Sequence, residues 1–355
     1  MEMIKRRKTK KIQVGKLDIG GDAPISVQSM TKTDTRNVEE TIRQIRNLER
    51  VGCELVRVAL PDKESALAIS KIKKRISIPL IADIHFDYRL ALLAIDSGAD
   101  KLRLNPGNIR TKWKVKEVVK AASQRGIPIR VGANSGSLPK SLLSKYKGPT
   151  PQAMIEAVMQ QIRLLEDMSF SNIVVSLKAT DVSTTIESYR RISSKIDYPL
   201  HLGVTEAGPP NTGIVRSSIG MGVLLCMGIG DTIRVSLTAD PVEEVKTGYR
   251  ILQSLGLREY GPILISCPTC GRCELNLLQI TKQVEKELSK IKSPIKVAVM
   301  GCVVNGPGEA READVGIAGA KGYGLLFRKG KIARKVKEKD LVRALLQEIE
   351  NIVKR

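Results

Sequence analysis

The chain has 355 residues, of which 42% are hydrophobic but only 3% aromatic, and its 59 Lys and Arg against 37 Asp and Glu give a formal charge of +22. Such a core must rely on Val, Ile and Leu, which favours buried parallel strands. The positive charge predicts an anionic partner, and the few aromatic side chains argue against stacking on nucleic-acid bases. No apolar stretch could span a bilayer and no secretory signal follows the basic segment 5–11, so we expect a cytoplasmic protein without membrane contact.

Eight short apolar runs follow one another over residues 25–239. Each run predicts a β-strand, and amphipathic stretches between them, such as 38–52 and 151–168, predict helices. Eight alternating units of this length are what a closed (β/α)₈ TIM barrel requires, whereas a doubly wound open sheet, the alternative, needs no such number. The predicted strands are 25–30, 54–60, 79–86, 101–106, 127–134, 172–179, 199–208 and 231–239.

Each apolar run leads into polar or charged residues. A lone charge inside a buried strand costs several kcal/mol unless it is paired or covered by a ligand. The carboxyl ends of barrel strands meet at one rim, where barrel enzymes bind their substrates. Four arginines and a lysine there outnumber Asp83 and Glu206, so we predict an anion site; a salt-bridged interior is the structural alternative. The residues are Gln28, Ser29, Arg57, Asp83, His85, Arg103, Asn105, Arg130, Asn134, Ser176, Lys178, Thr205, Glu206, Arg234 and Ser236.

The pattern changes after a predicted junction at 257–266. A helix (274–291), a strand (295–301), a further strand (314–319), a hairpin (322–336) and a closing helix (338–355) describe a small α+β domain. We therefore predict a barrel domain over residues 1–256 and an α+β domain over residues 262–355.

The α+β domain holds a cysteine cluster. Cys267, Cys270 and Cys273 are each separated by two residues, and Cys302 follows at a distance, just before Glu309. In a reducing compartment such spacing indicates a metal site rather than disulfides. Zinc sites usually pair two CxxC motifs, and the second pair is missing, which favours an iron–sulfur cluster over zinc or a redox switch. Counting thiols alone would make Cys273 the fourth ligand.

Three motifs of this domain resemble the iron–sulfur domain of the bacterial 4-hydroxy-3-methylbut-2-en-1-yl diphosphate synthase family. They are SCPTCGR (266–272), GCVVNGPGEA (301–310) and ADVGIAG (313–319). Barrel segments resemble the same family in the same order, so the resemblance covers nearly the whole chain. These segments are 27–35, 82–88, 101–109, 130–138, 174–180, 201–208 and 217–225.

The resemblance implies a reductive ring opening of 2-C-methyl-D-erythritol 2,4-cyclodiphosphate, with loss of water, to 4-hydroxy-3-methylbut-2-enyl diphosphate. It implies a [4Fe–4S] cluster held by Cys267, Cys270, Cys302 and Glu309. Cys273 departs from the family pattern, so its competition with Glu309 stays open. The resemblance further implies flavodoxin or ferredoxin as electron donor, and a head-to-tail homodimer in which one subunit's cluster domain covers the other's barrel.

The expected substrate contacts follow from this reading. Glu206 is the predicted acid–base residue, with a counter-ion role as the alternative. His85 orients substrate or only bonds Asp83, whereas His201, at the start of its strand, is expected to face the other end of the barrel. A nucleic-acid-binding module, and a zinc-dependent phosphatase or a Schiff-base aldolase using Lys178, are the remaining alternatives. The predicted substrate-binding residues are Arg57, Arg103, Asn105, Arg130, Asn134, Lys178, His85, Ser236 and, from the partner subunit, Asn305.

Overall fold

The structure is a computed structural model that describes residues 4–84, 87–104, 109, 111–303 and 306–354. The chain divides into two compact units, Met1–Arg258 and Glu259–Arg355. The division falls inside the stretch that the sequence marks as a junction. Within the described part of the chain, every helix is too short or too polar to cross a lipid bilayer.

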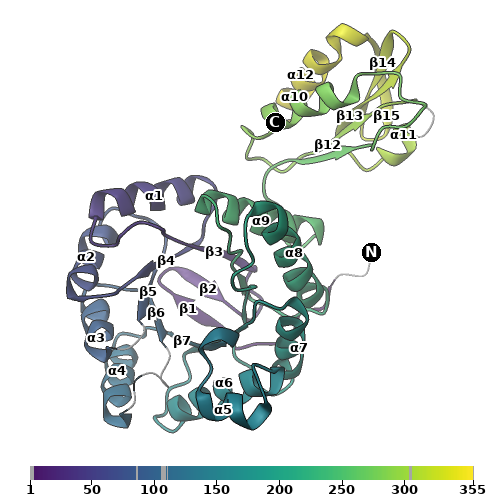
Figure 1. The fold of residues 1–355 in the computed structure, drawn as a ribbon. Coiled ribbons are helices and arrows are strands. Elements are labelled where there is room, and N and C mark those ends of the chain that lie inside the picture. The colour runs from purple at the N-terminus through teal and green to yellow at the C-terminus, as the bar shows by residue number, and fades with distance from the viewer. Residues whose placement is uncertain (1–3, 85–86, 105–108, 110, 304–305, 355) are drawn as a thin grey trace. The chain divides into compact units, whose positions relative to one another are not determined.

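The first unit is a closed barrel of parallel strands (Figure 1). Its eight strands are hydrogen-bonded in the order β8-β7-β6-β5-β4-β3-β10-β9, and a parallel bridge between Val175 and Leu200 joins the two outer strands. The TIM-barrel prediction is thus confirmed, and each predicted run contains one strand. The strands are β3 (Ser26–Met30), β4 (Leu55–Ala59), β5 (Leu80–Ile84), β6 (Lys101–Leu104), β7 (Ile129–Asn134), β8 (Ile173–Lys178), β9 (His201–Leu202) and β10 (Thr232–Ile233).

Helices surround the strands (Figure 1). Their starts are set by side chains that accept a backbone N–H of the first turn: Asn37, Asp62 and Asp181 do so for α1, α2 and α7. Each helix buries one apolar stripe, such as Ile42, Ile45 and Leu48 of α1. The helices are α1 (Val38–Arg50), α2 (Lys63–Lys73), α3 (Tyr88–Asp96), α4 (Lys112–Gln124), α5 (Lys140–Tyr146), α6 (Pro151–Glu166), α7 (Val182–Ser193), α8 (Pro210–Cys226) and α9 (Pro241–Ser254).

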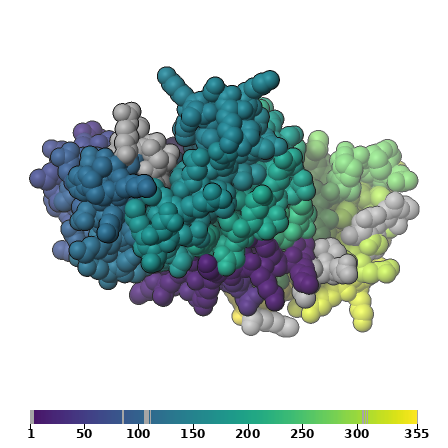
Figure 2. All heavy atoms as spheres, turned by 90° about the horizontal axis from the view of Figure 1, so that it is seen from below, coloured from purple at the N-terminus to yellow at the C-terminus, as the bar shows by residue number. Residues whose placement is uncertain are grey.

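A small hairpin, β1 (Ile12–Val14) and β2 (Leu17–Ile19), closes the amino end of the barrel. Its Ile12, Val14 and Ile19 are buried against interior residues of the barrel strands. Figure 1 shows the hairpin across the barrel, and Figure 2 shows the N-terminal segment along one end with α5 projecting from the other. The sequence analysis missed this hairpin, because strands of three residues are too short for a periodic signal.

The basic N-terminal segment also belongs to the barrel. The Arg7 guanidinium donates to the carbonyl oxygens of Ser193, Ile196 and Tyr198, and Arg6 forms a salt bridge of 3.0 Å with buried Asp231. These two cations therefore hold the chain against the ends of α7 and β10.

The second unit is a five-stranded mixed sheet in the order β11-β12-β13-β14-β15, in which β11, β12 and β13 are parallel. The predicted helices and strands are all present, but β11 lies inside the segment predicted to be only a junction. The elements are β11 (Ile263–Ser266), α10 (Leu277–Leu288), β12 (Lys296–Met300), α11 (Gly306–Glu309), β13 (Val315–Ala320), β14 (Tyr323–Arg328), β15 (Lys331–Lys337) and α12 (Leu341–Val353).

The two faces of this sheet pack differently. On one face Val284 of α10 and Leu345 of α12 pack with Val297 and Ile317 in the larger apolar cluster. On the other face the small side chains of Ala298 and Ala318 pack with Phe327. The carboxyl ends of the parallel strands β11 and β12 meet at one edge, where the cysteines are.

Candidate active site

The barrel interior changes character along each strand. Leu55, Ile81 and Val174 contact the hairpin at the amino end. Because side chains alternate between the two faces of a strand, Arg57, Asp83 and Lys178 face the interior in turn, closer to the carboxyl end. The interior side chains of β4, β5 and β8 are therefore apolar near the hairpin and charged closer to the carboxyl ends of these strands.

Asp83 lies between two arginines. Its Oδ2 is 3.5 Å from Arg57 Nε and its Oδ1 is 3.2 Å from Arg103 Nη1. Arg57 also reaches Met30 Sδ with Nη2 at 2.9 Å. Burial lowers the pKa of Arg57 to about 10, against the opposing effect of Asp83. The structural alternative is thus correct for Asp83, but a single carboxylate cannot balance the whole set of cations.

Arg130 provides the strongest evidence for an anion-binding site in the barrel. It is 2% exposed, and its Nε and Nη1 have no hydrogen-bond partner among the described residues. Burial lowers its pKa well below the usual range, and the charges of Arg57 and Arg103 lower it further. Because a buried guanidinium without an acceptor is costly, we interpret this position as built for an anionic ligand.

Lys178, at the end of β8, lies in the same region. It is 7% exposed, and its Nζ is 3.1 Å from Nε2 of His201. Gly203 makes room for it, since a Cβ there would come within 2.7 Å of Nζ. His201 begins β9, and it is the Lys178 side chain that reaches it, so the expectation that His201 belongs to the other end of the barrel stays a prediction.

Lys101 is a buried cation that the sequence analysis missed. It is 0% exposed and its Nζ has no hydrogen-bond partner among the described residues. Burial lowers the pKa of Lys101 well below its usual range, with further lowering by Arg130 and Arg57. The available signal was spacing: Lys101 shares a strand face with Arg103, two residues later.

These charges leave the interior cationic. Arg57 and Arg103 share Asp83, and Arg234 has Glu244 at 3.7 Å. Within the described residues, no carboxylate forms a salt bridge with Lys101, Arg130 or Lys178. Basic side chains therefore outnumber acidic ones in the barrel interior, as the sequence predicts for the strand ends. A bound anion would balance this excess of positive charge.

The other predicted barrel residues lie near the carboxyl ends of strands with varied exposure. Asn134 ends β7 and is half-buried, as is Ser236, which lies beyond the end of β10. Glu206 is exposed in a turn, with φ of 51°, and its Oε2 accepts from Thr180 Oγ1 at 3.2 Å. The predicted run 199–208 thus gives a strand only at His201–Leu202. His85 and Asn105 lie outside the described residues.

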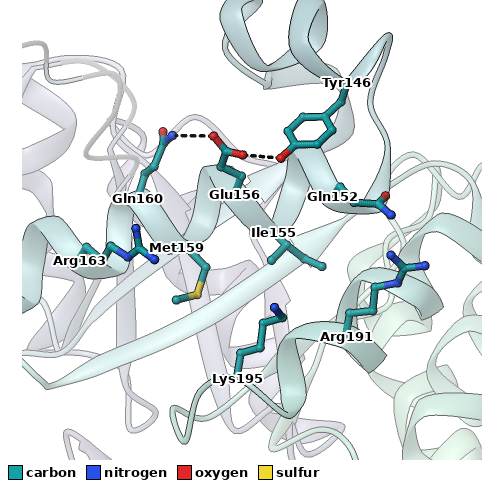
Figure 3. Close-up of a pocket in the computed structure, with 9 residues that line it drawn as sticks. All are labelled: Tyr146, Gln152, Ile155, Glu156, Met159, Gln160, Arg163, Arg191 and Lys195. Carbon is teal, nitrogen blue, oxygen red and sulfur yellow. Dashed lines mark hydrogen bonds between the residues drawn. The ribbon is translucent and has the colours of Figure 1, made fainter.

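A separate cavity lies on the outside of the barrel wall, between α6 and α7 (Figure 3). It has a volume of about 390 Å³, and its Glu156 accepts a hydrogen bond from Tyr146. Arg191 in its lining is paired with Glu187 of its own helix. No strand-end residue lines this cavity, so it is distinct from the predicted anion site.

In the second unit, parallel strand pairing brings distant cysteines together. Cys267 follows β11 directly and Cys302 lies two residues beyond β12. The Gly301 N–H donates to Cys267 Sγ at 3.3 Å. A Cβ on Gly301 would lie 2.5 Å from Cys273 Sγ and 3.4 Å from Cys267 Sγ, so only glycine fits between them.

The donor set at this edge suits a thiolate-bound cluster. All six cysteines, which lie among the described residues, are thiols, and Cys270 is exposed. No three Cys, His, Asp or Glu side chains in the described part of the chain already form a metal-binding group. The backbone of Glu309 ends α11, while its side chain, like Asn305, lies outside the description. The sulfur atoms of Cys273 and Cys267 both lie close to Gly301, so Cys273 belongs to the same group of thiols.

Comparisons with known proteins agree with this arrangement. Residues 9–249 match the family model described as the GcpE TIM-barrel domain, and residues 263–351 match the GcpE protein C-terminal domain. The chain is 62% identical to a protein of Thermodesulfovibrio yellowstonii and 58% identical to one of Clostridium tetani, each over 98% of this chain and 99% of the relative. Both relatives carry the name 4-hydroxy-3-methylbut-2-en-1-yl diphosphate synthase (flavodoxin).

Solved structures are similar to the barrel in fold. A dihydropteroate synthase of Yersinia pestis, in complex with a sulfonamide drug, gives a TM-score of 0.51 at 11% identity, covering 70% of this chain and all of that chain. A 3-dehydroquinate dehydratase of Geobacillus kaustophilus gives 0.50 at 14% identity, covering 70% and 99%. These likenesses concern the fold alone.

Proposed function

Because the chain belongs to the GcpE family, we propose that it catalyses the reaction for which its relatives are named. The enzyme is an oxidoreductase that opens the ring of 2-C-methyl-D-erythritol 2,4-cyclodiphosphate by reduction, with loss of water, to give 4-hydroxy-3-methylbut-2-enyl diphosphate. The observation that carries the assignment to this site is the buried guanidinium of Arg130, whose Nε and Nη1 have no partner among the described residues.

The diphosphate of the substrate is bound in the barrel by Arg57, Arg103, Arg130 and Lys178. Guanidinium groups donate paired hydrogen bonds that match phosphate oxygens, and burial excludes competing water. Asn134 and Ser236 are half-buried at strand ends, which supports neutral hydrogen bonds from them to the substrate. We assign His85 and Asn105, and Asn305 of a partner subunit, to the same binding role.

A [4Fe–4S] cluster is held by Cys267, Cys270, Cys302 and Glu309. The meeting of Cys267 and Gly301 at the ends of β11 and β12 supports this ligand set. When bound, such a cluster supplies electrons one at a time and acts as a Lewis acid toward an oxygen of the substrate. A carboxylate ligand is harder than a thiolate and is more easily displaced by oxygen, which favours Glu309 over Cys273.

Glu206 is the acid–base residue of the proposal. Loss of a hydroxyl as water requires a proton at the departing oxygen, and an exposed carboxylate can exchange protons with solvent. Its hydrogen bond from Thr180, which follows β8, supports an orientation near the strand ends. A counter-ion role for Glu206 is the alternative.

Electron transfer and assembly complete the proposal. We propose flavodoxin as the donor, because the name of the relatives includes it, and the chain's charge of +22 suits an acidic partner. We propose a head-to-tail homodimer in which the cluster domain, residues 262–355, serves the barrel domain, residues 1–256, of its partner. A cytoplasmic location stays a prediction.

The assignment is tested with protein purified anaerobically. We expect iron and sulfide in the wild type, an iron spectrum that the cyclic diphosphate perturbs, and turnover with a chemical reductant. Arg130→Met should abolish the perturbation, whereas Arg190→Met, at an exposed arginine paired with Glu187, should not. A colourless, zinc-loaded protein would contradict the proposal in favour of a zinc-stabilised barrel.

Two further comparisons test the ligand set and the dimer. Glu309→Gln should alter the cluster more than Cys273→Ser; loss of the cluster in Cys273→Ser alone would reverse the assignment. Mixing Glu206→Gln chains with Cys302→Ser chains should restore part of the activity, and no rescue in verified heterodimers would count against a site shared between subunits.

A further inference from the structure

The seam between β8 and β9 is held in an unusual way. The two strands share one isolated bridge, between Val175 and Leu200. Tyr189 of α7, which is 0% exposed, spans the seam: its hydroxyl donates to the His201 carbonyl at 2.5 Å and accepts from the Leu177 N–H at 3.0 Å. The backbone of His201 is therefore fixed from outside the barrel while its side chain faces the interior.

The imidazole of His201 links two interior side chains. It is 0% exposed, with Nδ1 at 2.5 Å from Thr232 Oγ1 and Nε2 at 3.1 Å from Lys178 Nζ. Burial lowers the pKa of His201 well below its usual range, and the neighbouring charge of Lys178 adds to this, so the ring is neutral. An ammonium group only donates, so with Lys178 charged the ring accepts at Nε2 and carries its proton on Nδ1.

Lys178 has cations on several sides. Burial lowers the pKa of Lys178 well below the usual range, and four arginines lower it further: Arg130 of β7, Arg234 directly after β10, Arg57 of β4 and Arg103 of β6. Among the described residues, the side chain that hydrogen-bonds to Lys178 is that of His201 alone. A hydrogen bond accepted from the charged form favours that form, which counteracts the surrounding charges.

We propose that His201 is a positioning residue for anion binding, which accepts a hydrogen bond from Lys178 Nζ and so keeps this ammonium charged and directed at the diphosphate. The proposal deepens the proposed function and rests on it. A carboxylate in place of His201 would hold Lys178 equally well, but its charge would compete with the substrate. A neutral imidazole holds the lysine and leaves the site cationic.

The probe is inorganic pyrophosphate, titrated calorimetrically into the anaerobically purified full chain between pH 6 and pH 10. His201→Leu should weaken pyrophosphate binding roughly tenfold or more, because the acceptor of a charged donor is lost. The pH at which binding fades on the alkaline side should move lower. His201→Gln keeps an acceptor oxygen and should recover part of both effects.

A double-mutant cycle separates positioning from mere packing. In a Lys178→Met background, His201→Leu should cause no further loss, since the residue through which it acts is gone. Equal losses of pyrophosphate affinity in both backgrounds would overturn the inference, and so would an unchanged alkaline pH limit of binding. Binding by the wild type would still support the anion site in either case. If His201→Leu does not fold, the same cycle is run with His201→Gln. Absence of wild-type binding would overturn both the inference and the proposed anion site.

Discussion

The two ends of the barrel are built from the same strands and yet have opposite properties. At the amino end, Leu55, Ile81 and Val174 pack against the hairpin in an apolar cluster. Two residues later on β4 and β5, Arg57 and Asp83 face the same interior. One step of the strand repeat thus separates an apolar plug from a cluster of buried charges.

This difference indicates that separate sets of interior side chains serve the stability of the barrel and the binding of its ligand. Burial of apolar side chains stabilises the barrel at its amino end, whereas the buried side-chain nitrogens of Arg130 and Lys101, which have no hydrogen-bond partner among the described residues, cost stability in the empty protein. Buried cations without partners are retained where a ligand supplies the missing charge. The following predictions test that division.

The largest effect is expected at Arg130. Arg130→Met removes a desolvated charge that we assign to the diphosphate, so pyrophosphate affinity should fall by about 30-fold or more, which corresponds to about 2–5 kcal/mol for a buried charge contact. Calorimetric titration measures it. An affinity within threefold (roughly 0.65 kcal/mol) of the wild type would show that Arg130 does not contact the anion.

A comparable change in stability, without a change in binding, is expected at the hairpin. Ile19 is 0% exposed, and Ile19→Ala should lower the free energy of unfolding by about 2–4 kcal/mol through loss of apolar contacts. Urea denaturation measures the change. Pyrophosphate affinity serves as the control; a parallel fall in affinity would mean that the two ends are not independent.

Lys101→Met should stabilise the empty protein. Replacing the buried amine of Lys101, which has no hydrogen-bond partner among the described residues, with an apolar side chain of similar length is expected to raise the free energy of unfolding by about 1–3 kcal/mol. The same variant should bind pyrophosphate more weakly, since a buried basic group near Arg130 and Arg57 is lost. Denaturation without and with pyrophosphate tests both, and a destabilised empty variant would contradict the idea that Lys101 serves binding.

A smaller, pH-dependent effect is expected from His201. Its folded-state pKa lies well below the usual value, so the unfolded chain binds the extra proton first as the pH falls through about 6.5. The His201 contribution therefore lowers stability with falling pH, by up to about 1.4 kcal/mol per pH unit. His201→Gln should show a flatter acid limb in urea denaturation between pH 7 and pH 5; identical slopes would mean that His201 takes up its proton equally in the folded and the unfolded chain.

The smallest effect is expected at the outer surface. Glu187 of α7 is half-buried and pairs with the exposed Arg190 and with Arg191 of the same helix. Glu187→Gln should change the free energy of unfolding by less than about 1 kcal/mol and leave pyrophosphate binding unchanged. A change in affinity there would indicate that surface charge, rather than the interior cluster, governs anion binding.

Much of the site was predictable because its signals are local. Charges such as Arg57 and Arg130 stand out inside apolar runs, and the spacing of Cys267, Cys270 and Cys273 indicates a metal site by itself. Lys101 was overlooked at the start of its run, although it shares a face with Arg103. No local sequence pattern indicates the contact between Lys178 and His201, since it joins side chains from two different strands.

By itself the sequence determined the eight-unit barrel and the appended α+β domain, since the alternation of apolar runs with amphipathic stretches is a property of the chain alone, and its motifs carried the resemblance to the family. Only the tertiary structure decided that a hairpin of three-residue strands closes the barrel, that β11 joins the second sheet, and that Gly301 lies between Cys267 and Cys273. Each of these depends on the register between segments far apart in the chain, which is set by packing rather than by local pattern.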